Sequence, residues 1–186
     1  MPKCVSSLCK DELKIPLTSR ILDLGCGSGL VGVELRNLGY TGTITGVDMS
    51  TTSLDVSAKR NVYTSLEIAN LSENISFLSA KSGTYDLVTC VGTTTYLSPD
   101  VLTGWKQLVR PGGLIVLTHR LDIGLKWLPA QDKLCENGVL EHVMTSKELL
   151  YLPGFNPEKK EYVQKSAQIY VFRRPMDDGA RDTTTK

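Results

Sequence analysis

No charge of one sign predominates in this chain of 186 residues. It has 21 Lys and Arg against 20 Asp and Glu, which gives a formal net charge of +1. Proteins that bind nucleic acid more often carry a basic stripe and a high isoelectric point, so the balance disfavours a nucleic-acid substrate. Hydrophobic residues make up 41% and charged residues 22%, the proportions of an ordinary globular protein. The length fits one domain with a sizeable core.

The sequence also lacks a long apolar run. No segment approaches the roughly 20 apolar residues that span a bilayer. The first ten residues contain Lys3 and Lys10 without an apolar stretch of signal-peptide length. We therefore expect no membrane association and a cytoplasmic location. Internal repeats are missing as well.

Cysteine pairs and metal-binding spacings are absent. The five cysteines are scattered and odd in number, and none forms a Cys-x-x-Cys pair or a cluster with a histidine. Disulfide frameworks and zinc sites both need such patterns. We therefore expect free thiols in a reducing compartment and no metal centre. The cysteines are Cys4, Cys9, Cys26, Cys90 and Cys135.

Strand-like and helix-like segments alternate along the chain, a pattern typical of a mainly parallel sheet covered by helices on both faces. Apolar runs predict strands at residues 20–24, 43–47, 64–68, 85–91 and 114–118, then two late strands at 139–152 and 167–173 around a polar loop at 153–160. Helical spacing and capping residues predict helices at 4–13, 30–38, 51–60, from Ser98 onward, and 122–136. We expect one domain at residues 1–174 and a disordered tail at 175–186.

The first long strand runs directly into a glycine-rich turn and then into a helix. The turn contains Gly25, Cys26, Gly27 and Gly29. Glycine permits positive φ and, having no Cβ, lets a ligand approach the backbone N–H groups closely. Ligands of open parallel sheets bind at this carboxyl edge. We therefore predict that these four residues contact a cofactor; the alternative is a plain turn.

Two acids beside the turn narrow the ligand class. Asp48 ends the second predicted strand, where a carboxylate can accept both hydrogen bonds of a ribose diol; the alternative is a helix-capping role. The next residue, Met49, can pack against an adenine face or fill the core. Asp23 lies two residues before the first glycine and disfavours a pyrophosphate but suits an ammonium and a sulfonium. Coulomb attraction at 4 Å is about 4 kcal/mol at an effective dielectric of ~20.

These residues resemble the class I S-adenosylmethionine-dependent methyltransferase superfamily. The similarity continues through Tyr85-Asp86-Leu87-Val88 and Val109-Arg110-Pro111-Gly112-Gly113-Leu114, and covers about residues 19–173. Within the superfamily, residues 29–32, 46–50 and 60–63 resemble the methyltransferase-like proteins of the Williams–Beuren critical region. The resemblance implies a single doubly wound, mainly parallel seven-stranded sheet whose last strand is antiparallel. It also implies S-adenosylmethionine as cofactor.

The resemblance further assigns roles to individual residues. It implies that Asp23, Gly25 and Gly27 face the methionine end of the cofactor, whereas Asp48 faces the ribose. We expect the methyl acceptor to be a small molecule or a protein, and a protein partner is also possible.

Four more cofactor-binding residues follow from the same resemblance. Asn70 and Leu71 fall where relatives carry an acidic and an apolar residue beside the adenine, and an Asn can still hydrogen-bond the adenine edge. Val91 and Gly92 are expected to line the methyl-transfer end. Residues 91–94 do not form the Asn/Asp-Pro-Pro-Tyr/Phe motif of many enzymes that methylate amino groups of bases or glutamine, which argues against those acceptors.

His119 is the candidate catalytic base, because it lies just past the fifth predicted strand at the functional edge. Tyr96 lies across the preceding loop. The alternative for His119 is a structural or exposed histidine, and we expect His142 to be structural. Cys26 is not expected to act as a nucleophile, since backbone approach explains the loop.

Two other functions stay open beside a methyltransferase. Only about 19 residues precede the first strand, fewer than in many relatives, and this favours a non-catalytic cofactor-binding partner protein. Residues 27–32 also match Gly-x-Gly-x-x-Gly, and this overlap alone favours an NAD(P)-dependent oxidoreductase.

Overall fold

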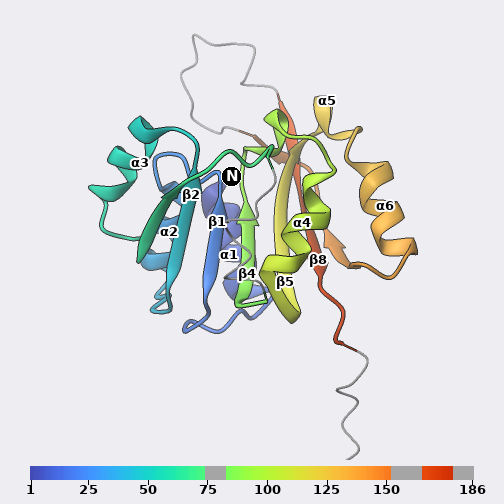
Figure 1. Ribbon diagram of the computed structural model, residues 1–186, viewed down its shortest axis with the longest axis horizontal. Coiled ribbons are helices and arrows are strands. Elements are labelled where there is room, and N and C mark those ends of the chain that lie inside the picture. Colours follow the sequence, from blue (N-terminus) through green and yellow to red (C-terminus); the bar gives the residue numbers. More distant parts are fainter. Residues whose placement is uncertain (74–82, 152–164, 178–186) are drawn as a thin grey trace, which may run out of the picture.

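The computed structural model describes residues 1–73, 83–151 and 165–177, which form one sheet with helices on both faces (Figure 1). The strands in these ranges are β1 (Ile21–Leu24), β2 (Ile44–Asp48), β3 (Ser65–Ile68), β4 (Tyr85–Cys90), β5 (Val109–Arg120), β6 (Glu141–Thr145), β7 (Leu149–Leu150) and β8 (Ser166–Arg173). The helices are α1 (Pro2–Asp11), α2 (Leu30–Asn37), α3 (Thr51–Ala58), α4 (Val101–Leu108), α5 (Leu121–Gly124) and α6 (Leu128–Glu136), with a 3-10 helix η2 (Thr94–Tyr96).

The strand order across the sheet is β3-β2-β1-β4-β5-β8-β6, and β7 pairs with the start of β8. The first five strands are parallel, whereas β8 runs antiparallel to β5, β6 and β7. This confirms the predicted doubly wound sheet with an antiparallel last strand. The direction of chain progression reverses beside β1, which lies between β2 and β4, and ligands of open α/β sheets bind at the carboxyl ends of the strands at such a point.

Two hydrophobic layers form the core, one on each face of the sheet. Trp105 of α4 and Trp127 pack on one face, and α1 and α2 cover the other. Alternate residues of a strand point to opposite faces, so Ile21 joins the α1–α2 layer and Leu22 the α4 layer. Asp23 therefore points to the same face as Ile21.

Local capping chemistry accounts for the helices that follow β1 and β2. The helix α2 begins after Gly29 (φ 86°) and ends before Gly39 (φ 92°), and these are angles that glycine adopts readily. The helix α3 begins after Ser50, whose hydroxyl accepts a hydrogen bond from the Ser53 N–H at 3.2 Å. Both helices occur where the sequence predicts them.

The prediction of one continuous helix at residues 122–136 is wrong, because the structure has two helices there, α5 and α6. Pro129 lies in the first turn of α6 and has no N–H to donate to Leu125, so a continuous helix would lose that bond. Trp127 lies between the two helices and is buried. The break therefore places an indole ring in the core.

The predicted strand at residues 139–152 is likewise divided into β6 and β7. After β6, the Ser146 hydroxyl accepts a hydrogen bond from the Ile169 N–H of β8 at 3.0 Å. A side-chain oxygen thus takes the place of a backbone carbonyl in the pairing with β8. Ser98 was expected to cap α4, but its hydroxyl donates to Asp100 at 2.9 Å and the helix begins only at Val101. Residue 152, the loop at 153–160 and residues 178–186 of the predicted tail lie outside the described residues.

Over the described ranges, no helix combines the length and the apolar character that crossing a membrane requires. All five cysteines are free.

Candidate functional site

A cavity of about 290 Å³ lies at the carboxyl edge of the sheet, beside the point where the strand order reverses. Its walls come from the loops that follow β1, β2, β3 and β4. Six predicted cofactor-binding residues line it: Gly25, Gly27, Asp48, Met49, Asn70 and Leu71. These six residues come from three separate segments of the sequence, and the fold brings them to one cavity.

The glycines of the loop serve different purposes. Gly27 has φ 52°, and a Cβ added there would meet no atom within 4 Å, so this position faces open space at the cavity. Gly25 has φ 71°, and a Cβ there would lie 2.2 Å from the Thr93 hydroxyl oxygen. That hydroxyl donates to the Gly25 carbonyl at 3.1 Å. Gly25 therefore allows the loop after β4 to pack onto the loop after β1.

Asp48 is fixed by two backbone amides. One carboxylate oxygen accepts from the Gly27 N–H at 2.8 Å and the other from the Ser50 N–H at 2.9 Å. Because a carboxylate offers about four lone-pair sites, each oxygen keeps capacity for one more donor. Both oxygens can therefore accept from a ligand diol without losing their contacts with the protein.

The opposite walls combine polar and apolar side chains. The Asn70 side chain accepts from the Ser72 N–H at 3.0 Å and donates to Glu73 at 2.8 Å, so its own loop orients the amide. Leu71 is buried, whereas Met49 is 67% exposed and Tyr96 82% exposed at the cavity. An apolar rim with few polar groups is typical of small-ligand sites.

Sequence reasoning missed several lining residues. These are Ala69, Ser72, Thr93 and Leu97. The available signal was their position directly after β3 and β4, since the carboxyl ends of parallel strands meet at one edge. Their side chains carry no chemistry that would have singled them out.

Asp23, which the resemblance places facing the methionine end of the cofactor, does not line the cavity. It is 1% exposed, and it accepts hydrogen bonds from the Tyr63 hydroxyl at 2.7 Å and the Thr89 hydroxyl at 2.9 Å. Burial raises the pKa of Asp23 to about 6, against the opposing effect of the two hydroxyl donors. Its charge can therefore reach a ligand only through the glycine loop.

Cys26 and Gly29 also lie off the cavity. Burial, reinforced by the nearby carboxylates of Asp23 and Asp48, raises the pKa of the Cys26 thiol, so the thiol stays protonated and is no nucleophile. Gly29 faces Ser57, whose hydroxyl oxygen would lie 2.6 Å from an added Cβ. Gly29 is therefore required by packing against α3 rather than by a ligand approaching from the cavity.

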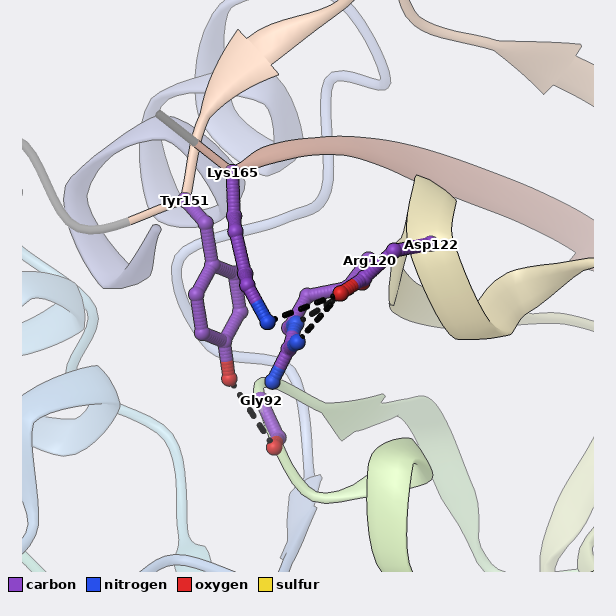
Figure 2. Close-up of polar contacts among 5 residues, drawn as sticks. All are labelled: Gly92, Arg120, Asp122, Tyr151 and Lys165. Carbon is purple, nitrogen blue, oxygen red and sulfur yellow. Dashed lines mark hydrogen bonds and ion pairs between the residues drawn. The ribbon is translucent and has the colours of Figure 1, made fainter. Parts of the chain in front are cut away.

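Val91 and Gly92 lie at the end of β4, outside the wall of the cavity. Figure 2 shows the Tyr151 hydroxyl directed at the Gly92 carbonyl, to which it donates at 3.2 Å. Arg120 lies 5.5 Å from the centre of the Tyr151 ring, and Asp122 pairs with both Arg120 and Lys165. A side chain 59 residues away in sequence thus occupies the carbonyl of Gly92.

His119 is a core residue, which corrects its assignment as the catalytic base. It is 1% exposed, and its ring lies 4.7 Å from Trp127 and 4.9 Å from Tyr170 between ring centres. One ring nitrogen bonds the Thr94 hydroxyl at 3.1 Å and the other the Gln131 amide nitrogen at 2.7 Å. Burial, with a smaller effect of Lys126, lowers the pKa of His119 to about 3. With both nitrogens engaged inside the protein, His119 cannot reach a substrate in this geometry.

The fold and the cavity together define an open-sheet protein whose ligand site is built at a glycine loop. Comparison with protein families identifies the class: the model of the methyltransferase domain matches residues 21–113, half of the chain. The chain belongs to this family. The match includes the glycine loop, Asp48 and the loops after β3 and β4.

Individual relatives agree with this assignment. The chain is 31% identical over 115 residues to the ubiquinone biosynthesis O-methyltransferase of Escherichia coli, a match that covers 60% of the chain and 47% of that enzyme. The chain thus matches only about half the length of this curated relative.

Solved structures share the fold at low identity. An S-adenosylmethionine-dependent methyltransferase from Mesorhizobium loti superposes with a TM-score of 0.66 at 15% identity, over 94% of this chain and 100% of the other. A second S-adenosylmethionine-dependent methyltransferase, from Corynebacterium glutamicum, superposes with a TM-score of 0.64 at 17% identity, over 91% of this chain and 87% of the other.

Proposed function

We propose that the protein is an S-adenosylmethionine-dependent methyltransferase. The observation that carries this proposal is the meeting of Asp48 and the bare backbone of Gly27 at one cavity, in a chain of the methyltransferase-domain family. The volume of about 290 Å³ is near the lower end of ligand pockets, which start at roughly 300 Å³. The match to the family favours a methyltransferase over the oxidoreductase alternative, which only the overlapping glycine pattern supports.

The residues present fit the cofactor. Asp48 would accept from the ribose hydroxyls, Gly27 would allow close approach of the backbone, and Asn70 and Leu71 would lie beside the adenine. The bound cofactor supplies the reactive methyl group, so the protein chiefly orients the reactants and excludes water. Because His119 lies in the core, it is not available as a general base.

The acceptor we propose is a small molecule or a protein, rather than nucleic acid. The near-zero net charge supports this, because a nucleic-acid substrate favours a basic surface. The relative in Escherichia coli is an O-methyltransferase, which favours an oxygen atom as the acceptor. We also propose kinship with the methyltransferase-like proteins of the Williams–Beuren critical region, supported by residues 60–63. A cytoplasmic location is supported by the five free cysteines.

S-adenosylhomocysteine is expected to raise the melting temperature, whereas NAD is not, because the Asp23 carboxylate favours a cationic ligand end and opposes a pyrophosphate. A ligand at 100 times its dissociation constant adds about 2.7 kcal/mol to the free energy of unfolding, which a thermal melt resolves. A melt that millimolar S-adenosylhomocysteine leaves unchanged would overturn the proposal. Labelled cofactor, incubated with the protein and an extract, then separates an enzyme from a non-catalytic binding protein.

Asp48→Ala is expected to weaken binding of S-adenosylhomocysteine at least tenfold, because hydrogen bonds to a charged group contribute about 1.5–3 kcal/mol each. Calorimetric titration gives the affinity. Asp55→Ala is the matched control, since Asp55 is an exposed acid on the adjoining helix α3 and its loss changes the net charge equally. If both variants bind like the wild type, Asp48 only orders the protein backbone.

A further inference from the structure

Tyr63 packs its ring against three glycines of the sequence segments that suggested a cofactor site. A Cβ added at Gly32 would lie 2.7 Å from the Tyr63 ring, one at Gly46 3.0 Å and one at Gly29 3.1 Å. Real Cβ atoms essentially never come as close as the distance at Gly32, and they seldom come as close as those at Gly46 and Gly29, so a side chain at any of the three would press on the ring. The ring thus fills the space that these three glycines leave behind the cofactor loop.

The Tyr63 hydroxyl joins two groups that have few other partners. It donates to one oxygen of Asp23 at 2.7 Å and accepts from the Gly32 N–H at 3.2 Å. Gly32 lies in the first turn of α2, where amides have no partner within the helix. Burial and the neighbouring Asp23 raise the pKa of Tyr63, so the phenol stays protonated and is the donor to the carboxylate.

We propose that Tyr63 is a positioning residue for the cofactor: its hydroxyl holds the Asp23 carboxylate behind the glycine loop and ties it to the first turn of α2. This inference rests on the proposed function. Tyr63 does not line the cavity, so it acts through Asp23, whose charge attracts the ammonium of the cofactor's methionine end.

The groups around Asp23 determine how its pKa changes when the Tyr63 hydroxyl is removed. Three groups act on Asp23, the hydroxyls of Tyr63 and Thr89 and the carboxylate of Asp48. The thiols of Cys26 and Cys90 lie near enough for the charge of Asp23 to raise their pKa values. Burial and the charge of Asp48 raise the pKa of Asp23, whereas the hydroxyls of Tyr63 and Thr89 lower it. Loss of the Tyr63 hydroxyl therefore raises this pKa further, and more of the carboxyl is protonated at neutral pH.

Tyr63→Phe tests the proposal, because it removes only the hydroxyl and keeps the ring between the glycines. Calorimetric titration with S-adenosylhomocysteine from pH 5.5 to 8.5 is expected to show about tenfold weaker binding at pH 7. The midpoint at which affinity is lost on acidification should move to higher pH. Binding of 5′-methylthioadenosine, which lacks the amino-acid end, should change less than twofold.

A double-mutant cycle with Asp23→Asn separates positioning from general structural damage. If Tyr63 acts through the carboxylate, adding Tyr63→Phe to Asp23→Asn costs less than twofold in affinity. Tyr40→Phe is the matched control: among the described residues, the Tyr40 hydroxyl is buried without a hydrogen-bond partner, so its loss should leave binding unchanged. Melting without ligand checks that each variant folds. In the Asp23→Asn/Tyr63→Phe variant residue 23 is an amide, so no buried carboxylate loses a hydrogen-bond donor.

The outcomes distinguish this inference from the proposed function. Wild-type affinity in Tyr63→Phe, an equal loss in the Asp23→Asn background, or an unmoved pH midpoint would each overturn the role of Tyr63. Failure of the wild type to bind S-adenosylhomocysteine would instead overturn the proposed function.

Discussion

Gly27→Val is expected to abolish detectable binding of S-adenosylhomocysteine while the protein still folds. The Cβ at residue 27 enters open space at the cavity, so the branched side chain occupies the volume that the cofactor needs. The backbone amide that holds Asp48 is disturbed at the same time. Calorimetric titration measures the loss.

Gly138→Val separates binding from backbone strain. Gly138 has φ 65° and, like Gly27, nothing within 4 Å of an added Cβ, but it follows α6 and does not line the cavity. Both variants place a β-branched residue at positive φ, which costs roughly 1–2 kcal/mol of stability. We expect similar losses in melting temperature and a loss of affinity in Gly27→Val alone. Normal affinity in Gly27→Val would mean that the ligand binds elsewhere.

The burial of His119 is expected to make stability fall on acidification. Its pKa is about 3 in the folded protein, below the unperturbed value of about 6.5. The unfolded state therefore binds more protons between these values, and the stabilisation present above pH 6.5 is lost as the pH falls. Between pH 7 and pH 4 this amounts to roughly 3 kcal/mol.

Asp23 acts in the opposite direction, because its pKa of about 6 is raised and its protonation favours the folded state in acid. The wild-type curve therefore contains two offsetting contributions. The difference in unfolding free energy between the wild type and His119→Asn isolates the histidine, and it should shrink by roughly 3 kcal/mol from pH 7 to pH 4. His142→Asn, at an exposed histidine on β6, is the matched control. A difference that is constant with pH would contradict the lowered pKa of His119.

The parts of the fold that depend on neighbours in sequence were predictable. The apolar runs of β1 and β4 and the helices that begin at residues 30 and 51 occur as expected, because they depend on local sterics and hydrogen bonds such as the Ser50 cap and the positive φ of Gly39. The interruption between α5 and α6 at Trp127 was not predicted, although the proline that causes it, Pro129, is visible in the sequence.

The residues of the site also fall into two groups, those predictable from their place in the sequence and those that depend on distant contacts. Asp48 and Gly27 were predictable because Asp48 ends one parallel strand and Gly27 lies in the loop after another, and the carboxyl ends of these strands share one edge. The burial of His119 depends on Trp127 and Tyr170, and the partner of Asp23 is forty residues away at Tyr63. Such contacts between distant segments leave no periodic signal in the sequence.

The two amides that hold Asp48 have a thermodynamic consequence. A free carboxylate would lose rotational freedom on meeting a ligand, and this ordering would reduce the observed affinity. Here the Gly27 and Ser50 amides have already selected its orientation, so the site is preorganised and the entropic cost falls mainly on the ligand. The same bonds lock the loop after β1 to the start of α3, and a substitution that shifts either segment is transmitted to the other.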